Sequence, residues 1–99
     1  MSEKVIQAEG VLVTDPFPYQ SVEEQTEVLL AKFQPTKPLI VDQAAVTEVY
    51  LNLGDDVRGL EDGDHVTVSG PIVERKMVTR SGKIRRGGIY QILVDKIER

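Results

Sequence analysis

Short runs of alternating apolar and polar residues, each ended by glycine, proline or aspartate, follow one another along the chain. Val5–Thr14 is rich in β-branched residues, and Gly10 in its middle is typical of a strand that bends or bulges. Thr47–Leu53 and His65–Ile72 alternate with the period of two that turns one side of a strand toward a core. Ile89–Ile97 has apolar residues at both odd and even positions, as expected of a central strand covered on both faces. The pattern predicts a protein built mainly from strands.

The residue types between these runs indicate turns. Asp15-Pro16-Phe17-Pro18 predicts an extended loop, because its two prolines remove backbone donors. Leu39–Val41 is a further apolar run, and Asp42-Gln43 after it predicts a turn. Gly54-Asp55-Asp56 ends one strand, and Gly70-Pro71 predicts a bend or bulge inside another. These breaks divide the chain into five or six short strands.

The segment Ser21–Phe33 is compatible with two structures. Ser21 and Glu24 have the spacing of a capping box, and three apolar residues of the segment fall near one helical face, which favours a helix. Thr26–Phe33 also has the residue types of a strand. We favour the strand, since the rest of the chain is strand-like.

The alternation also predicts which side chains form the core. On Thr47–Leu53 the apolar residues at odd positions should point inward, leaving Tyr50 and Asn52 outside. Val57 and Leu60 should close the bottom of the core from a short segment without a full helix. The other predicted core residues are Val11, Val13, Val49, Leu51, Leu53, Val66, Val68, Ile92 and Val94.

These elements indicate an all-β fold, a small closed or partly open barrel. A sandwich or an SH3-like barrel is the alternative architecture. Ninety-nine residues with 40% hydrophobic content support one compact domain, residues 1–99, with no room for a second core. The chain has no Cys, which excludes disulfides and thiolate metal sites.

Two phrases in the second half of the chain are typical of a known fold. Gly59–Lys76 reads GLEDGDHVTVSGPIVERK, with Gly-Asp-x-Val-x-Val-x-Gly at Gly63–Gly70, and Gly87–Arg99 reads GGIYQILVDKIER. They resemble the last two strands of the OB-fold, in the class of nucleic-acid-binding domains that includes single-stranded DNA-binding proteins and replication protein A. Leu39–Asp56 is similar to strands two and three of that pattern. The resemblance implies a five-stranded OB-like barrel that binds nucleic acid.

The chain departs from this pattern in two places. The helix that usually lies between strands three and four is absent, or reduced to one turn around Val57–Leu60. Residues 15–38 are longer than a simple first turn requires, which identifies them as a candidate insertion.

Half of the Lys and Arg residues lie in Arg75–Arg86, which reads RKMVTRSGKIRR and contains no carboxylate. Residues 1–74, in contrast, hold four basic residues and fourteen acidic ones. This separation indicates a local anion-binding element on an acidic protein, with single-stranded nucleic acid, DNA or RNA, as its most obvious partner. In the fold that the chain resembles, this basic stretch connects strands four and five, and that loop contacts oligonucleotides. A solvated hairpin without a partner has the same composition.

Eight residues are the predicted nucleic-acid contacts. Tyr50 is the expected base-stacking platform, unless its ring packs on an adjacent strand. The hydroxyl of Tyr90, next to the basic stretch, is a further candidate for a phosphate contact. Phe17 and Tyr19 form either a second platform or the anchor of their own loop, and Phe33 belongs to the core. The predicted phosphate-binding cations are Arg75, Lys76, Arg80, Lys83, Arg85 and Arg86.

Nothing in the sequence predicts catalysis. His65 is the single histidine and lacks the spacing of a metal site, so we expect it to be a surface residue. The carboxylates between Asp55 and Asp64 are explained by their turn positions without a cation. No Walker or Rossmann glycine pattern is present. We therefore expect a protein that is not an enzyme and that has no cofactor or metal.

The alternative function is a protein-interaction or accessory-subunit module without nucleic-acid contact. In that case the basic stretch docks on a second copy of the chain or on a larger protein. The N-terminus lacks the positive flank and apolar run of a secretory signal, and no stretch approaches the roughly 20 apolar residues of a membrane span. The expectation is a soluble, cytoplasmic protein that does not bind membranes.

Overall fold

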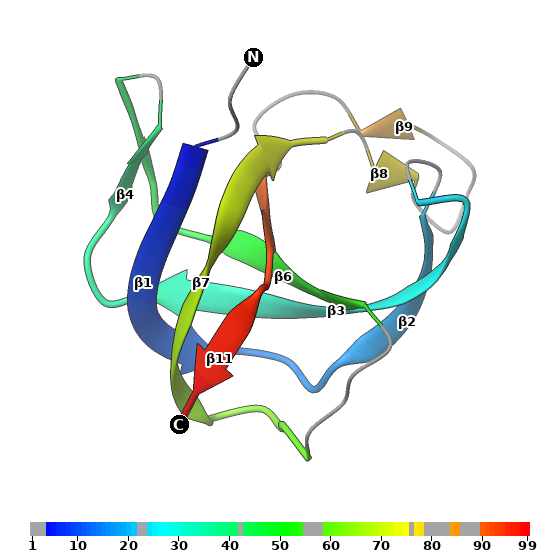
Figure 1. The fold of residues 1–99 in the computed structure, drawn as a ribbon, viewed down its shortest axis with the longest axis horizontal. Coiled ribbons are helices and arrows are strands. Elements are labelled where there is room, and N and C mark those ends of the chain that lie inside the picture. Colours follow the sequence, from blue (N-terminus) through cyan, green and yellow to red (C-terminus); the bar gives the residue numbers. More distant parts are fainter. Residues whose placement is uncertain are drawn as a thin grey trace.

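A closed β-barrel forms the body of the protein (Figure 1). The structure is a computed structural model that describes residues 4–21, 24–41, 43–54, 59–75, 77–78, 84–85 and 90–99, with residues 4, 77, 78, 84 and 85 described by their backbone alone. Five strands make up the barrel, in the order β1 (Lys4–Leu12), β3 (Thr26–Pro35), β6 (Val49–Gly54), β10 (Tyr90–Leu93) and β7 (His65–Glu74).

The barrel closes because β1 pairs with both β3 and β7. Strands β6 and β10 are parallel, whereas the other neighbouring barrel strands are antiparallel. The described residues contain no helix, and the connection from β6 to β7 is described only at residues 59–64. The prediction of an all-β, five-stranded OB-like barrel is confirmed.

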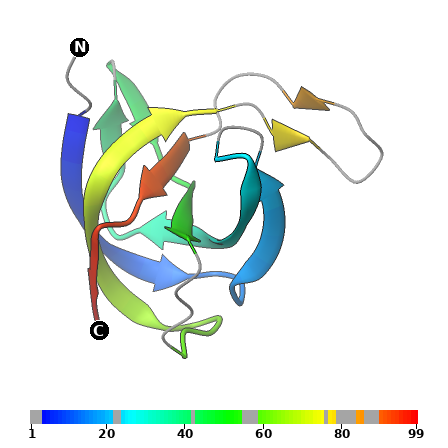
Figure 2. The ribbon, with the colours of Figure 1, turned by 45° about the vertical axis from the view of Figure 1, so that its right-hand side comes forward.

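The remaining strands extend or flank the barrel. Strand β2 (Phe17–Ser21) pairs with β3, and β11 (Lys96–Glu98) pairs with β7. Two hairpins lie outside the barrel, β4 (Leu39–Val41) with β5 (Ala44–Val46) and β8 (Met77–Val78) with β9 (Ile84–Arg85). Figures 1 and 2 show the two hairpins on opposite sides of the molecule, with β8 and β9 near the end where β2 turns into β3.

The second barrel strand lies earlier in the chain than the resemblance implies. Placing strands two and three both in Leu39–Asp56 is wrong, since strand two is β3 and that segment contributes only β6 to the barrel. Residues 15–38 are likewise not an insertion, because they supply β2 and β3. The apolar run Leu39–Val41 pairs with β5 instead, across the turn predicted at Asp42-Gln43, where Gln43 has a positive φ of 69°.

The extended loop predicted at Asp15–Pro18 is wrong in its second half. Phe17 begins β2, and Pro18 lies opposite Leu29 of β3. In the described part of the chain β2 has only β3 as a neighbour, so it is an edge strand. Proline is tolerated on an edge strand, because only one side of such a strand pairs through backbone donors.

The ambiguous segment is a strand, as favoured from the sequence. Thr26–Pro35 forms β3, and the capping-box pair lies in the turn before it. Ser21 Oγ donates to Glu24 Oε1 at 2.6 Å, and the Glu24 amide donates to Ser21 Oγ at 3.3 Å. The same side-chain interaction that would begin a helix therefore closes a hairpin turn.

The predicted core lies inside the barrel. Leu60 is also buried, Phe33 joins the same cluster, and Val94 packs against it while half-buried. Val57 lies outside the described residues. Six of the other predicted core residues are buried: Val49, Leu51, Leu53, Val66, Val68 and Ile92.

The core prediction is wrong for β1. Ala8 and Leu12 are buried, whereas Val11 and Val13 are only half-buried. The run Val11-Leu12-Val13 is apolar at odd and even positions alike, so alternation alone does not decide which side chains face inward. Its orientation follows from the pairing of β1 with β7, which places Ala8 opposite the buried Val68.

Two glycines allow backbones to approach closely where strands change partners. At Gly10, β1 pairs with β3 as well as β7, and a Cβ would overlap the carbonyl oxygen of Gln34. At Gly70, the predicted bend of β7, the paired strand changes from β11 to β10. A Cβ there would overlap the carbonyl oxygen of Leu93. Barrel closure therefore depends on the absence of two side chains.

Candidate functional site

The candidate site lies on the outer face of β3, β6 and β10. Leu51 and Ile92 point into the core, so their neighbours on β6 and β10 point outward. Strand pairing places Lys32, Tyr50 and Gln91 in one outward row and Leu30 and Asn52 in the next. We call this surface the outer face.

Tyr50 packs edge-on against Phe17 of β2. Their ring centroids are 6.3 Å apart and the rings are inclined by 83°, an arrangement that aromatic pairs favour. Tyr50 remains half-buried, so part of its surface is accessible. It points outward, as predicted, and it also has the packing contact that the alternative interpretation proposed. Its role in stacking a base stays a prediction.

Next to the aromatic pair, one carboxylate oxygen accepts three hydrogen bonds. Glu24 Oε1 accepts from Ser21 Oγ at 2.6 Å, from Arg75 Nη1 at 2.7 Å and from Asn52 Nδ2 at 3.2 Å. Gln91 Oε1 accepts weaker bonds from Arg75 Nη1 and Asn52 Nδ2, each at 3.4 Å. We call these five residues the polar cluster.

The polar cluster joins two connections of the barrel. Glu24 lies in the turn between β2 and β3, and Arg75 follows β7 at the start of the basic stretch. The Arg75 side chain is 12% exposed and the Glu24 side chain 29% exposed. Asn52 and Gln91 are buried beneath them. The ion pair therefore holds the start of the basic stretch against the β2–β3 turn.

The cluster keeps Glu24 ionised. Partial burial raises the pKa of Glu24. The hydrogen bonds from Ser21, Arg75 and Asn52, together with the charge of Arg75, lower this pKa by more than burial raises it. The net pKa lies below the ordinary value of a glutamate, 4.5. The carboxylate is thus a permanent negative charge on the outer face near neutral pH.

A second carboxylate partners the other cation of this face. Lys32 Nζ lies 3.4 Å from Glu48 Oε1, with the two side chains 36% and 55% exposed. Exposed pairs of this kind are weak. Among the described residues of the outer face, each cation therefore has an acidic partner, and the Arg75 pair is the better buried.

The structure describes the side chains of three of the eight predicted contacts, Tyr50, Arg75 and Tyr90. Arg75 belongs to the polar cluster, and Tyr90 lies opposite Glu74 with its side chain against the core. Arg85 is described only as backbone of β9, whose pairing with β8 forms the expected hairpin between β7 and β10. Lys76, Arg80, Lys83 and Arg86 lie outside the described residues.

The sequence alone did not reveal the partners of Arg75. The prediction that Asn52 is exposed is wrong, since it is 7% exposed beneath Glu24 and Arg75. Gln91 interrupts an apolar run, whereas Asn52 occupies one of the polar positions of an alternating run, so only Gln91 is marked by the sequence as a buried polar residue. The position of Gln91 indicates a buried polar group that needs partners but does not identify them.

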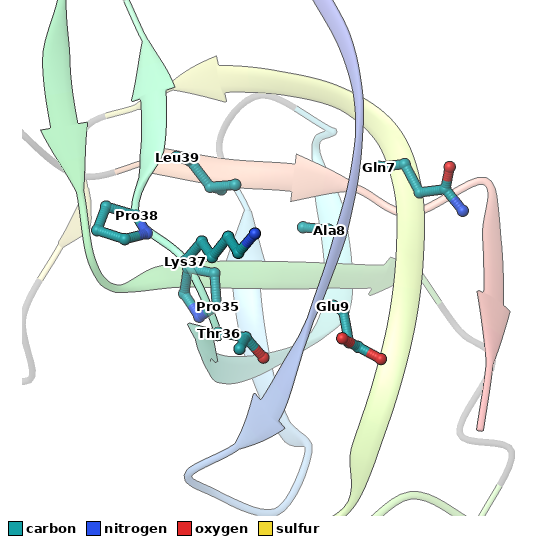
Figure 3. Close-up of a pocket in the computed structure, with 8 residues that line it drawn as sticks. All are labelled: Gln7, Ala8, Glu9, Pro35, Thr36, Lys37, Pro38 and Leu39. Carbon is teal, nitrogen blue, oxygen red and sulfur yellow. The ribbon is translucent and has the colours of Figure 1, made fainter.

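Two of the hollows on the described surface lie next to the polar cluster and next to β1. One of about 270 Å³ adjoins the polar cluster and has Glu24, Asn52 and Asp95 in its wall. The other, of about 290 Å³, lies between β1 and the segment that joins β3 to β4. Figure 3 shows Lys37 extending across it toward β1. It shares no lining residue with the polar cluster.

The described residues include no group of three or more His, Asp or Glu side chains placed to hold a metal ion. In the same part of the chain, no helix is both long and apolar enough to cross a membrane.

Comparisons with known proteins place the fold. No protein-family model and no curated protein sequence matches the chain. A solved structure is similar over 99% of this chain and 94% of its own, the small single-stranded DNA-binding protein from Streptomyces coelicolor. Its TM-score is 0.60 and its sequence identity 20%. At that identity the likeness shows a shared OB-like barrel.

Proposed function

We propose that the protein binds single-stranded nucleic acid without chemistry, as one cytoplasmic domain of residues 1–99. The observation that carries this proposal is the position of Tyr50, an outward ring next to the polar cluster from which the basic stretch begins. Aromatic rings and nearby cations are the two elements with which proteins bind single strands.

Each element has a distinct task in this proposal. The ring of Tyr50, supported from its edge by Phe17, stacks on a base. Lys76, Arg80, Lys83, Arg85 and Arg86 of the basic stretch bind phosphates, together with Arg75, and the Tyr90 hydroxyl is a further candidate for such a contact. The function of the structurally similar protein, which binds single-stranded DNA, supports this proposal.

A first test is titration of labelled DNA and RNA oligonucleotides, single- and double-stranded, with the wild-type protein. Single strands are expected to bind more tightly, because stacking needs unpaired bases. At most six phosphate contacts form, and each releases about 0.7 counterions. A plot of the logarithm of the binding constant against the logarithm of the salt concentration should therefore fall with a slope no steeper than roughly 4. No binding at about 50 mM salt, or a preference for duplex, would contradict the proposal.

The stacking role of Tyr50 predicts a graded effect of two substitutions. Tyr50→Ala should weaken single-strand binding by about 5-fold to 150-fold, the equivalent of one stacked base. Tyr50→Phe keeps the ring and should bind within about twofold of wild type, since the hydroxyl is not needed for stacking. Fluorescence anisotropy with an oligothymidylate measures both. Equal loss in the two variants would mean that Tyr50 acts through its hydroxyl and not through stacking.

A protein-interaction module is the second candidate. Val5 and Ile40 are the most exposed large hydrophobic side chains of the described residues, at 67% and 61%. They lie on β1 and β4, the strands on either side of the hollow in Figure 3. Exposed apolar side chains that form a patch are typical of a contact with another protein. The oligonucleotide titration separates the two candidates, since this one predicts no binding to any strand.

A further inference from the structure

The bonds around Glu24 are those of an anion site that the protein occupies with its own side chain. A hydroxyl, an amide N–H and a guanidinium converge on Glu24 Oε1 at 2.6 to 3.2 Å. A phosphate oxygen carries a similar charge and accepts the same donors at the same distances. Arg75 is only 12% exposed, so its charge is less screened there than it would be in open solvent.

We propose that Ser21, Asn52 and Arg75 form a phosphate subsite of the nucleic-acid groove, and that Glu24 occupies it in the free protein. This inference rests on the proposed function and adds to it the regulation of one contact. When a strand binds, a backbone phosphate displaces the Glu24 carboxylate and takes over its donors. Glu24 is then an internal competitor that lowers affinity, although it belongs to the binding site.

The surroundings of Glu24 allow this exchange. Its side chain is 29% exposed, so a ligand has access to it. The adjoining hollow of about 270 Å³ provides space beside the carboxylate, and Tyr50 is the strand partner of Gln91. A base stacked on Tyr50 therefore brings its phosphate next to the polar cluster. Gln91 accepts from both Arg75 and Asn52 and so positions these donors whichever anion is bound.

The test compares Glu24→Gln with a matched charge change elsewhere. Glutamine keeps an acceptor for Ser21, Asn52 and Arg75 but removes the competing charge. Glu98→Gln is the control, because Glu98 also forms an ion pair, with Lys96 at 3.1 Å, but lies on β11. Glu24→Gln should bind oligothymidylate roughly fivefold more tightly than wild type, the equivalent of one partly exposed ion pair. Glu98→Gln should stay within about twofold, since screening weakens charges more than about 8 Å away.

Salt dependence gives a second signature. In the wild type the Arg75–Glu24 pair carries no net charge, so a phosphate bound there is not neutralised and keeps the cations condensed around it. In Glu24→Gln the positive charge of Arg75 neutralises that phosphate, and those cations are released from the strand. The salt slope of this variant should therefore be steeper by roughly 0.7. A purely structural role of Glu24 does not change this slope.

A third measurement separates this inference from the proposed function. The NMR signal of the Arg75 Nε–H is followed during titration with inorganic phosphate, which should shift it at lower concentration in Glu24→Gln than in wild type or Glu98→Gln. If wild type binds oligonucleotides, Glu24→Gln binding no more tightly than Glu98→Gln overturns the inference. If no variant binds an oligonucleotide, the proposed function fails. The subsite then stands only if phosphate shifts Arg75 more readily in Glu24→Gln, and falls if it does not.

Discussion

Replacing Arg80, Lys83, Arg85 and Arg86 together by alanine is expected to remove most of the affinity for single-stranded nucleic acid. Four of the six proposed phosphate contacts disappear, so the salt slope should become shallower by roughly 3. At about 50 mM salt this corresponds to a loss of about a hundredfold to a thousandfold. Anisotropy titrations at several salt concentrations measure both quantities.

The control removes charge without touching the basic stretch. Lys37, Lys96 and Arg99 lie on other parts of the described surface, beside the hollow of Figure 3 and on or next to β11. Their replacement by alanine should lower affinity only a few-fold, because salt screens charges more than about 8 Å from the ligand. A quadruple variant that binds as well as this triple variant would show that overall charge, and not the stretch, determines binding.

Gly70→Ala and Gly10→Ala are expected to cause the largest losses of stability. Each added Cβ overlaps a backbone carbonyl oxygen, of Leu93 and Gln34 respectively, and no side-chain rotation relieves the overlap. Separating the strands should lower the free energy of unfolding by at least about 3 kcal/mol. In a domain of this size the melting temperature falls by roughly 10 to 25 °C. Thermal unfolding followed by circular dichroism measures the effect.

Gly54→Ala provides the comparison within the same barrel. Gly54 has a positive φ of 65°, but a Cβ there meets no atom within 4 Å. Its substitution should cost about 1 kcal/mol, the strain of a left-handed backbone in an L-residue. If Gly54→Ala loses as much stability as Gly10→Ala, whose glycine does not have a positive φ, close approach of the backbones is not the main reason for Gly10.

The sequence predicted the fold well where strands alternate, and less well where they do not. The apolar residues at the odd positions of Thr47–Leu53 and at the even positions of His65–Ile72 are buried, so the inward residues were identified correctly, although Asn52 on the other side of its strand is buried as well. Val11-Leu12-Val13 is apolar at odd and even positions alike, and only the pairing of β1 with β7 determines which of these side chains point inward. Leu39–Val41 resembled a barrel strand because a hairpin beside a barrel and a strand within it have the same local pattern.

The candidate site was predictable in its charge and not in its contacts. The basic stretch is visible from composition, and the outward ring of Tyr50 from alternation. The polar cluster joins Ser21, Glu24, Asn52, Arg75 and Gln91, which only the closed barrel brings together. The spacing of Ser21 and Glu24 was noted from the sequence, but it was equally compatible with the start of a helix. The local sequence does not reveal that Arg75, far along the chain, also binds Glu24.

The insertion of β10 between β6 and β7 also has a consequence for biosynthesis. Strands β1, β3, β6 and β7 leave the ribosome first, but the edges of β6 and β7 that β10 will occupy stay unpaired until β10 follows. Closing the distant parallel pair of β6 and β10 is slow, since folds rich in such non-local pairs form on the order of milliseconds to seconds. During that interval the nascent chain exposes two strand edges to other polypeptides. The extent to which the nascent chain needs chaperones should thus depend on how quickly β10 pairs with β6 and β7.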